Sequence, residues 1–341
     1  MSSTLFDVAL DPDLSQGAYN AVNVCLKVRP EEKVTLITDA ASGSIAASLA
    51  HELEGVGAPY HLWELEELAP RPLQSAPPEI LQDLETSQVS IFAICAQPHE
   101  LPSRRQITEV AVRRKIRHAH MVNITKQIMM EGMRADFRKV DAISRRVLEI
   151  VSAAEPIRVK SAAGTDLVAQ FNPGYRWLKT SGIISPETWS NLPGGEVFTA
   201  PERVDGTFVV DGVVGDYLCA RFGDLRNQPL TIRVRENRLV EAHSENRELE
   251  QEFWAYTHSD ANSDRVGEFA IGTNVGVRGV IGNILQDEKI PGVHIAFGDP
   301  LGAYTGATWN CSTHIDVVGT RFDIFVGERQ LMRGGNFLLD S

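Results

Sequence analysis

The first half of the chain alternates between two hydrophobic periodicities. Short apolar runs such as 33–39 and 89–95 have the length and composition of buried strands. Segments such as 42–57 and 103–116 instead place apolar residues three and four positions apart, which is the spacing of one helix face. The other strand-like and helical segments of this half are 14–28, 59–65, 118–125 and the long amphipathic region 127–154. Strands that alternate with helices predict an α/β layer with a largely parallel sheet.

The hydrophobic pattern changes near residue 155. Three later segments have the strand–turn–strand pattern of an antiparallel hairpin: 156–171, 229–244 and 320–337. The second of them is expected to turn at Glu236 and Asn237, and one helical segment, 245–259, interrupts the hairpins. We therefore predict two domains, an α/β domain over residues 1–155 and a β-rich α+β domain over residues 156–341.

Composition narrows the classes of protein to which the chain can belong. Of its 341 residues, 43% are hydrophobic and 23% are charged, which is ample apolar material for a buried core. The net charge of -12 argues against a general nucleic-acid binder, because such proteins usually carry a basic face. No apolar run reaches the length of a membrane span, and the N-terminus has no secretory signal pattern. Four scattered cysteines without a C-x-x-C pair favour reduced thiols, and we expect a cytoplasmic protein.

Candidate chemistry is concentrated in the second half of the chain. Four apolar or glycine-bounded segments carry possible metal ligands, which are Glu196, Glu268, His294, and the pair His314 and Asp316. In a strand, His314 and Asp316 point to the same face. Imidazole together with carboxylate suits zinc, cobalt, manganese or iron. Five donors exceed the three that one catalytic zinc usually takes from a protein, and this excess favours two metal ions.

The candidate residues also have ordinary interpretations. A histidine on an apolar strand is more often a hydrogen-bonded core residue than a ligand, and a glutamate in a strand usually faces solvent. His118 and His120 lie two apart on a strand-like run, where a packing or surface role is favoured over a metal. Asp299 is a candidate for binding a substrate amine, but a role in a turn is favoured. Trp177 and Trp189 are candidates for a pocket or an interface, with core packing as the alternative.

Four motifs in a fixed order carry a resemblance to a known family. N-x-P-x-x-E-V-F-T-x-P covers 191–201, G-E-x-A-x-G-x-N covers 267–274, H-x-A-x-G covers 294–298, and H-x-D covers 314–316. In this order the motifs resemble the M29 family of metallo-aminopeptidases, the group that includes aminopeptidases T and S. The resemblance is strongest over residues 157–341.

The resemblance implies a metal-dependent hydrolase that cleaves an amide or an N-terminal peptide bond. It implies two divalent ions, zinc, cobalt or manganese, held by Glu196, Glu268, His294, His314 and Asp316. The implied catalytic residues are two. Glu196, or alternatively Glu268, would carry a proton, and Tyr304 would donate a hydrogen bond to the oxyanion. A homodimer that acts on a small-molecule or peptide substrate is also implied. The segment 299–313 is shorter than we expect in the peptidases, which leaves open the choice between a peptide and a small amide.

Two rival functions remain open at the level of the sequence. The 2,5-dihydroxypyridine dioxygenases look like relatives of the M29 family with the same fold, and these dioxygenases use a single non-haem iron. His294, His314 and Asp316 could form a two-histidine, one-carboxylate set for Fe(II). The presence of both Glu196 and Glu268 favours two ions and hydrolysis instead. The other rival is a non-catalytic ligand-binding relative, which the complete set of ligands disfavours.

Overall fold

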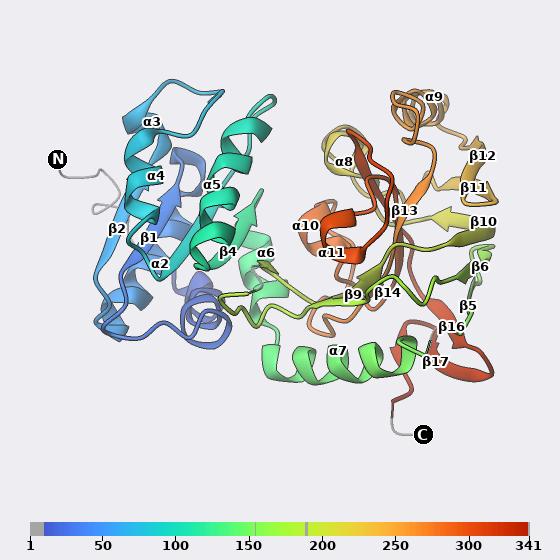
Figure 1. Ribbon diagram of the computed structural model, residues 1–341, viewed down its shortest axis with the longest axis horizontal. Helices are drawn as coiled ribbons and strands as arrows, with labels where there is room; N and C mark the ends of the chain where they lie inside the picture. The colour runs from blue at the N-terminus through green and yellow to red at the C-terminus, as the bar shows by residue number, and fades with distance from the viewer. Residues whose placement is uncertain (1–9, 154, 188–189, 340–341) are drawn as a thin grey trace. The chain divides into compact units, whose positions relative to one another are not determined.

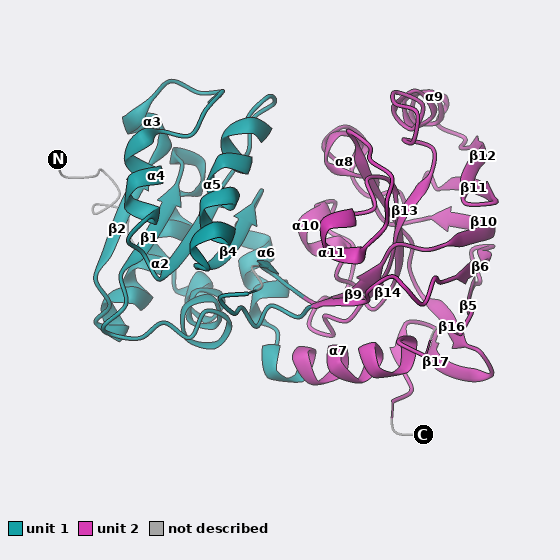
Figure 2. Ribbon diagram, viewed as in Figure 1, with its two compact units in different colours: residues 1–139, 180–194 teal, residues 140–179, 195–341 magenta. Residues whose placement is uncertain are grey.

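The computed structural model forms two compact units (Figures 1 and 2) and describes residues 10–153, 155–187 and 190–339. As far as they are described, unit 1 comprises residues 1–139 and 180–194, and unit 2 comprises residues 140–179 and 195–341. The change of pattern between residues 155 and 156 therefore falls inside unit 2. Our predicted boundary concerns domains that fold separately. It stays a prediction, because compactness alone does not show which part folds by itself.

Unit 1 is built around a five-stranded parallel sheet. Its strands, in spatial order, are β2 (Tyr60–Glu64), β1 (Val34–Thr38), β3 (Val89–Ile94), β4 (Arg117–Val122) and β8 (Ser190–Asn191). All neighbouring strands in this order run parallel. β1 and β3 are buried along their whole length, as expected for apolar runs that are covered on both faces. The predicted α/β layer with a largely parallel sheet is thus confirmed.

The helices of the first half cover the predicted helical segments, but one predicted region is broken, and two further helices, over 65–68 and 78–84, lie where no helix is predicted. They are α1 (Ser15–Tyr19), α2 (Gly43–Val56), α3 (Leu65–Leu68), α4 (Pro78–Leu84), α5 (Leu101–Arg114), α6 (Lys126–Met130) and α7 (Phe137–Val151), with the short helical segments η2 (Pro12–Leu14), η3 (Asn20–Cys25), η4 (Ala40–Ser42) and η5 (Gly132–Arg134). The sequence predicts one helical region over 127–154, whereas the structure has a break between α6 and α7. Ala135 leaves helical geometry, with ψ at 149°. The Asp136 carboxylate then accepts hydrogen bonds from the backbone N–H groups of Arg138 and Lys139, so a new helix begins there.

Unit 2 contains two antiparallel sheets. The larger sheet has the order β12 (Arg238–His243), β11 (Leu230–Arg235), β10 (Arg203–Val210), β6 (Asp166–Gln170), β5 (Ile157–Ser161), β16 (Phe322–Val326), β17 (Arg329–Arg333) and β18 (Asn336–Phe337). The smaller sheet, called sheet C below, has the order β15 (His314–Val318), β14 (Gly292–Gly298), β13 (Val266–Gly272), β9 (Glu196–Thr199) and β7 (Leu178–Thr180). The three predicted hairpins are confirmed as β5–β6, β11–β12 and β16–β17. The second turns at Glu236 and Asn237, both at positive φ, as predicted.

The two sheets of unit 2 share one hydrophobic core. Sheet C contributes Phe269, Ile295 and Phe297, and the larger sheet contributes Phe208 and Ile324. Residues of α7, α8 (Asp216–Phe222) and α9 (Arg247–Tyr256) join this core, while the short helices α10 (Ile284–Asp287) and α11 (Gly302–Thr305) precede and follow β14 along the chain (Figure 1). None of the helices in the described part of the chain is long and apolar enough to cross a membrane. Because one face of sheet C is committed to the core, its other face is left for polar side chains.

Candidate metal centre

All five predicted ligands lie on sheet C of unit 2. Glu196 begins β9, Glu268 lies in β13, His294 lies in β14, and His314 and Asp316 lie in β15. These strands are neighbours in the sheet, although β9 and β15 are far apart in the sequence. The fold therefore gathers on four adjacent strands the residues that the sequence analysis singles out.

The register of the strands puts these side chains on one face. In an antiparallel sheet, residues directly opposite each other point to the same side. Glu268 lies opposite Ala296, and Ala296 lies opposite Asp316. His294 and His314 precede Ala296 and Asp316 by two positions, so they point to the same side as well. The prediction that His314 and Asp316 share a face is consistent with this register.

Small residues occupy much of the remaining space on this face. Glu196 lies opposite Gly272, which follows Glu268 by four positions and therefore belongs to the same face. Ala270 and Ala296 lie between the ligands on β13 and β14. The opposite face of the same strands carries large apolar residues that belong to the core. Large apolar residues alternate along these strands with ligands and small residues. One side of sheet C is therefore polar and carries few large side chains apart from the ligands.

Two glycines of the motifs are required by the backbone. Gly267 lies at an irregularity of β13 just before Glu268, and a side chain at this position would meet the carbonyl oxygen of Gly298 at 2.6 Å. Gly298 itself has φ +109°, a region that residues with a side chain rarely adopt. The close approach of the two strand ends explains why a glycine precedes Glu268 and why another ends the segment that carries His294.

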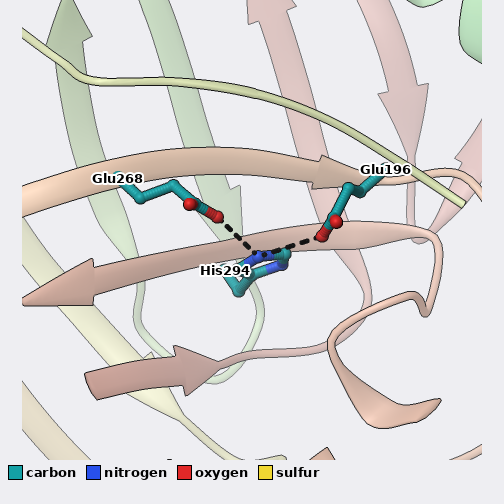
Figure 3. A group of neighbouring side chains, drawn as sticks. All are labelled: Glu196, Glu268 and His294. Atoms are coloured by element: carbon teal, nitrogen blue, oxygen red, sulfur yellow. Dashed lines mark hydrogen bonds and ion pairs between the residues drawn. The ribbon is translucent and has the colours of Figure 1, made fainter. Parts of the chain in front are cut away.

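Glu196, Glu268 and His294 meet around one imidazole nitrogen (Figure 3). His294 Nε2 lies 3.2 Å from Glu268 Oε1 and 3.6 Å from Glu196 Oε2. The two carboxylates approach the ring from opposite sides (Figure 3). All three residues are buried, so the charges of the carboxylates are poorly screened by water. Three strands thus contribute one donor each to a compact group.

His314 and Asp316 extend the same cluster. His314 Nε2 lies 3.7 Å from Glu268 Oε2 and 3.5 Å from Asp316 Oδ1. The other ring nitrogen, Nδ1, lies 3.0 Å from the backbone carbonyl oxygen of Asp299, to which it can only donate a hydrogen bond. In the neutral ring this hydrogen bond leaves Nε2 unprotonated. An unprotonated nitrogen facing carboxylates is the form of histidine that binds a metal ion.

The donor atoms form three overlapping groups, and within each group they lie within 4.8 Å of one another. The groups are the Glu196 group (Glu196, Glu268 and His294), the His314 group (Glu268, His314 and Asp316) and the Glu288 group (Glu288, His294 and Asp316). Glu268 belongs to the first two groups, and its two oxygens face different histidines. All five predicted ligands are therefore brought together, and Glu268 lies at the centre of the cluster.

Two residues of the cluster were missed by the sequence analysis. Glu288 and Lys289 follow α10, in the short connection that leads to β14. Lys289 is 1% exposed, and its Nζ lies 2.7 Å from Glu196 Oε2 and 2.6 Å from Glu288 Oε1. The only sequence signal was the charged run D-E-K shortly before a strand that carries a ligand. Such a run is usually a solvated turn, so the sequence favoured the wrong environment for it.

The carboxylates reverse the effect of burial on the two histidines. Burial lowers the pKa of His294, but the hydrogen bond and charge of Glu268, with the charges of Asp316 and Glu196, outweigh it and raise the pKa to about 9. Burial also opposes the charged form of His314. The charge of Asp316 and its hydrogen bond, followed by the charge of Glu268, nevertheless raise the pKa of His314 well above its ordinary value. The face of sheet C therefore has a strong preference for positive charge.

The pKa values of Asp316, Glu288 and Lys289 are shifted as well. Burial raises the pKa of Asp316, but the nearby histidines, His314 first, outweigh burial and lower the pKa to about 2. Burial raises the pKa of Glu288 to about 8, although the charge of Lys289 opposes this. Burial disfavours the ammonium of Lys289, yet Glu196 and Glu288 raise its pKa above the ordinary value. Lys289 therefore remains a cation inside the cluster.

The loop between β14 and β15 carries two further candidates. Tyr304 lies in α11, its side chain is 46% exposed, and it makes no side-chain hydrogen bond with the rest of the described chain. Its backbone carbonyl accepts a hydrogen bond of 2.6 Å from Arg176 Nε, which anchors the turn. The Asp299 carboxylate accepts a hydrogen bond from the backbone N–H of Leu301. This is the turn role that the sequence favours for Asp299.

Of the other candidates of the sequence analysis, His118 and His120 belong to unit 1 and Trp177 belongs to unit 2. His118 and His120 lie in β4 of unit 1 and are buried; His118 Nδ1 lies 2.8 Å from Ser90 Oγ. Burial lowers the pKa of His118 to about 4 and lowers that of His120 well below its ordinary value. Trp177 packs against aromatic rings of the unit 2 core. Trp189 lies outside the described residues.

The chemistry of the cluster fits a divalent metal. Four carboxylates and two imidazoles face each other, and the Lys289 ammonium forms ion pairs with two of the carboxylates, Glu196 and Glu288. Buried carboxylates in such excess require cations to offset the cost of desolvation. Mixed oxygen and imidazole donors are the ligands of zinc, cobalt, manganese and iron in proteins.

A comparison with known families agrees with this chemistry. The profile of the family described as thermophilic metalloprotease (M29) matches residues 106–310, which is more than half of the chain. The chain belongs to the M29 peptidase family. Three of the four motifs lie inside the matched span, and the H-x-D motif follows it closely. The resemblance seen in the motifs is confirmed, and membership of M29 supports a metal-dependent peptidase. No curated protein sequence matches this M29 chain significantly.

Two solved structures share the fold of this M29 member. Wild-type AmpT from Thermus thermophilus is 18% identical, with a TM-score of 0.70, covering 97% of this chain and 100% of that chain. The 2,5-dihydroxypyridine dioxygenase from Pseudomonas putida KT2440 is 14% identical, with a TM-score of 0.69, covering 95% of this chain and 96% of that chain. At such low identities the likeness shows the fold alone. The expected relationship in fold between the M29 family and the dioxygenase is confirmed.

Proposed function

We propose that this protein is a metal-dependent hydrolase that cleaves an amide or an N-terminal peptide bond. Its membership of the M29 family supports the class of reaction. The observation that carries the proposal is the position of Glu268. Its Oε1 lies 3.2 Å from His294 Nε2, and its Oε2 lies 3.7 Å from His314 Nε2. A carboxylate whose two oxygens face two different histidines is suited to be shared by two ions.

We propose that the Glu196 group and the His314 group each hold one divalent ion, zinc, cobalt or manganese. The two groups share Glu268, as bridging carboxylates do in two-metal hydrolases. Bound ions would supply Lewis-acid chemistry, which polarises a carbonyl group and lowers the pKa of a water molecule. This proposal assigns all five ligands expected from the sequence, without using Glu288.

The chain's own residues would move the protons. We propose that Glu196 accepts a proton at a carboxylate oxygen and returns it to the leaving amine, which is general acid–base catalysis. Lys289 Nζ lies 2.7 Å from Glu196 Oε2, so its ammonium can donate a hydrogen bond that orients this carboxylate. The excess of carboxylates also favours the free α-amine of a substrate, because that amine is positively charged. An acidic site of this kind suits an exopeptidase.

We propose that Tyr304 stabilises the negative charge that develops on the carbonyl oxygen of the substrate. The exposed phenol has its hydroxyl available for a substrate, and the hydrogen bond from Arg176 holds the backbone that carries it. A preorganised hydroxyl donor aimed at a developing oxyanion lowers the activation barrier.

A second candidate function is favoured by one observation. Lys289 already neutralises Glu196, which the two-ion proposal requires as a ligand. If a single ion is bound, His294, His314 and Asp316 remain as a two-histidine, one-carboxylate set suited to Fe(II). A ring-cleaving dioxygenase is therefore the alternative. A non-catalytic ligand-binding protein is the third possibility.

We also propose the partners expected from the sequence. They are a small-molecule or peptide substrate and a second copy of the chain in a homodimer, with no nucleic acid and no membrane. The net charge of -12 supports the exclusion of nucleic acid. A cytoplasmic location remains part of the proposal. The molar mass in solution, measured by light scattering, tests the homodimer.

The test of the proposed function is a substrate panel on the reconstituted full chain. Protein loaded separately with Zn²⁺, Co²⁺, Mn²⁺ or Fe²⁺ is given aminoacyl amides, short peptides and 2,5-dihydroxypyridine, while product formation and oxygen consumption are followed. We expect hydrolysis with Zn²⁺, Co²⁺ or Mn²⁺ and its loss in Glu268→Gln. Glu79→Gln, at an exposed position on α4, is the control. Oxygen consumption with Fe²⁺ and no hydrolysis would establish the dioxygenase instead.

A further inference from the structure

Lys289 is a cation that the chain itself supplies to the ligand cluster. Its side chain is 1% exposed, and it forms ion pairs with Glu196 and Glu288 at 2.7 Å and 2.6 Å. A buried lysine usually loses its proton, because burial disfavours the charged form. Two buried carboxylates at this distance retain the charge. The cluster therefore contains one fixed positive charge before any metal binds.

The contact of Lys289 falls on the oxygen that a metal ion would need. Glu196 Oε2 lies 2.7 Å from Lys289 Nζ and 3.6 Å from His294 Nε2. This is the Glu196 oxygen that faces His294 within the Glu196 group. An ion in that group and the ammonium of Lys289 would therefore compete for the same atom.

The His314 group is free of this competition. Among the described residues, no lysine or arginine nitrogen forms an ion pair with Glu268 or Asp316. Their ion-pair partners are the imidazoles of His294 and His314, which can release their protons to become ligands. The ammonium of Lys289 cannot become a ligand in its charged form. The two groups, although they share Glu268, are thus unequal.

We propose that Lys289 sets the order and the number of bound metal ions. This inference rests on the proposed function. The His314 group takes the first ion tightly. The Glu196 group takes a second ion only when Glu196 exchanges its contact with Lys289 for the metal, so the second ion binds more weakly. At low metal concentration the protein then holds a single ion, and a two-ion protein forms at higher concentration.

The experiment is a titration of the metal-free full chain with Mn²⁺. Calorimetry gives the affinities, and electron paramagnetic resonance counts free Mn²⁺ and detects coupled pairs of bound ions. We expect two resolved steps in the wild type. In Lys289→Met, which keeps the length of the side chain and removes its charge, the second step should tighten about tenfold or more, while the first changes little.

Two further variants keep the test decisive. Lys289→Arg retains a positive charge and should keep the second step weak. The double variant Glu288→Gln with Lys289→Met removes one carboxylate together with the ammonium, so it avoids an uncompensated buried charge. It should tighten the second step as Lys289→Met does, even if the single variant fails to fold. Thermal unfolding of each metal-free variant reports on folding.

The outcomes separate this inference from the proposed function. A second step that is equally weak in the wild type and in both Lys289→Met variants, with the first step retained, overturns the role of Lys289. Two equally tight ions in the wild type also overturn it, while leaving a two-metal hydrolase intact. If neither the wild type nor any variant binds Mn²⁺, the metal centre itself is wrong.

Discussion

Two pairs of histidines on strands of this chain lie in opposite electrostatic surroundings. In unit 1, burial lowers the pKa of His118 to about 4, and burial with the charges of His118 and Arg104 lowers that of His120 well below its ordinary value. In unit 2, carboxylates overcome burial and raise the pKa of His294 to about 9 and that of His314 well above its ordinary value. All four histidines lie on strands, and all but the partly buried His314 are buried. The difference teaches that carboxylate neighbours are what distinguish a candidate cation site from a packed pair of histidines.

The two units also neutralise their carboxylates in different ways. In unit 1, Arg71 forms ion pairs with Asp39, Glu66 and Glu100, and it is itself 4% exposed. Backbone N–H groups supply further hydrogen bonds to these carboxylates. In unit 2, Lys289 forms ion pairs with Glu196 and Glu288, while Glu268 and Asp316 are paired with the imidazoles of His294 and His314. The carboxylates of unit 1 are paired with a permanent cation and with backbone donors, whereas Glu268 and Asp316 are paired with imidazoles, which can release their protons and become metal ligands.

The largest expected effect separates the two pairs of histidines. His294→Asn should lower the hydrolytic activity of the metal-loaded protein by about a thousandfold or more, because it removes a donor from two of the three groups. His118→Asn is the matched control, because the surroundings of His118 lower rather than raise its pKa. Activity and bound metal are measured for both variants. An equal loss of metal in both variants would remove the distinction between the pairs.

The second prediction concerns the ion pairs of Arg71 in unit 1. Glu100→Gln should lower the free energy of unfolding by about 3 kcal/mol near neutral pH, because it leaves Arg71 buried with a weaker partner. Burial raises the pKa of Glu100, but the hydrogen bonds from Arg71 and the backbone lower it to about 2, below the ordinary 4.5. The contribution of Glu100 to the free energy of unfolding is therefore present above pH 4.5 and is lost as the pH falls toward 2.

Urea unfolding near neutral pH and in acid measures this second effect. Glu66→Gln removes the more exposed partner of Arg71 and should cost less. A penalty for Glu100→Gln that stays the same in acid would mean that the ion pair is not its source. Bound metal should be unchanged in both variants, because neither residue belongs to the cluster on sheet C.

Removal of metal should destabilise unit 2 and leave unit 1 unchanged. Chelation from a metal concentration about a hundred times the dissociation constant should lower the free energy of unfolding of unit 2 by about 2–3 kcal/mol. Hydrogen exchange of backbone amides locates the effect. We expect faster exchange in β13, β14 and β15 and no change in β3 and β4. Protection that falls equally in both units would contradict the assignment of the metal to sheet C.

The phenol of Tyr304 should have a smaller effect than the ligands. Tyr304→Phe is expected to lower kcat about tenfold with little change in KM, because the hydroxyl would act mainly on the transition state. Metal content should stay the same, because Tyr304 belongs to none of the three donor groups. Tyr217→Phe, at another exposed tyrosine, is the control. Unchanged kcat in Tyr304→Phe would leave the aromatic side chain with a structural role only.

The smallest predicted effect is the acid sensitivity of unit 1. Because burial lowers the pKa of His118 from 6.5 to about 4, the neutral ring is the form that the fold stabilises. This contribution to stability is fully present above pH 6.5 and is lost as the pH falls through about 4. The loss should be on the order of 1 kcal/mol at about pH 6. Unfolding of the wild type and of His118→Gln is compared across this range, and the variant should show a flatter pH profile.

The faces of sheet C could be predicted from the sequence to a large extent. His314 and Asp316 are two positions apart in a strand, and glycines flank Glu268 and follow His294, so local periodicity and backbone requirements single out these candidate residues and the face they share. The hairpin turn at Glu236 and Asn237 was likewise a local signal. Predictions of this kind succeed because the information lies within a few neighbouring residues.

The rest of the cluster could not be predicted, because it depends on long-range contacts. Lys289 and Glu288 follow a helix of one turn, and nothing local distinguishes them from a solvated charged turn. Their role appears only when the fold brings Glu196 to within 2.7 Å of Lys289. The return of residues 180–194 to unit 1 was also missed, since β8 is two residues long and has no periodicity to detect.

The most direct test of a metal centre on sheet C is anomalous diffraction from crystals of the full chain loaded with Co²⁺. Data collected at the cobalt absorption edge place every bound ion in the map. The account predicts a strong peak between Glu268, His314 and Asp316, a second peak beside Glu196 and His294 at high cobalt concentration, and none near His118 and His120. A map without a peak at Glu268, or with its main peak in unit 1, would contradict it.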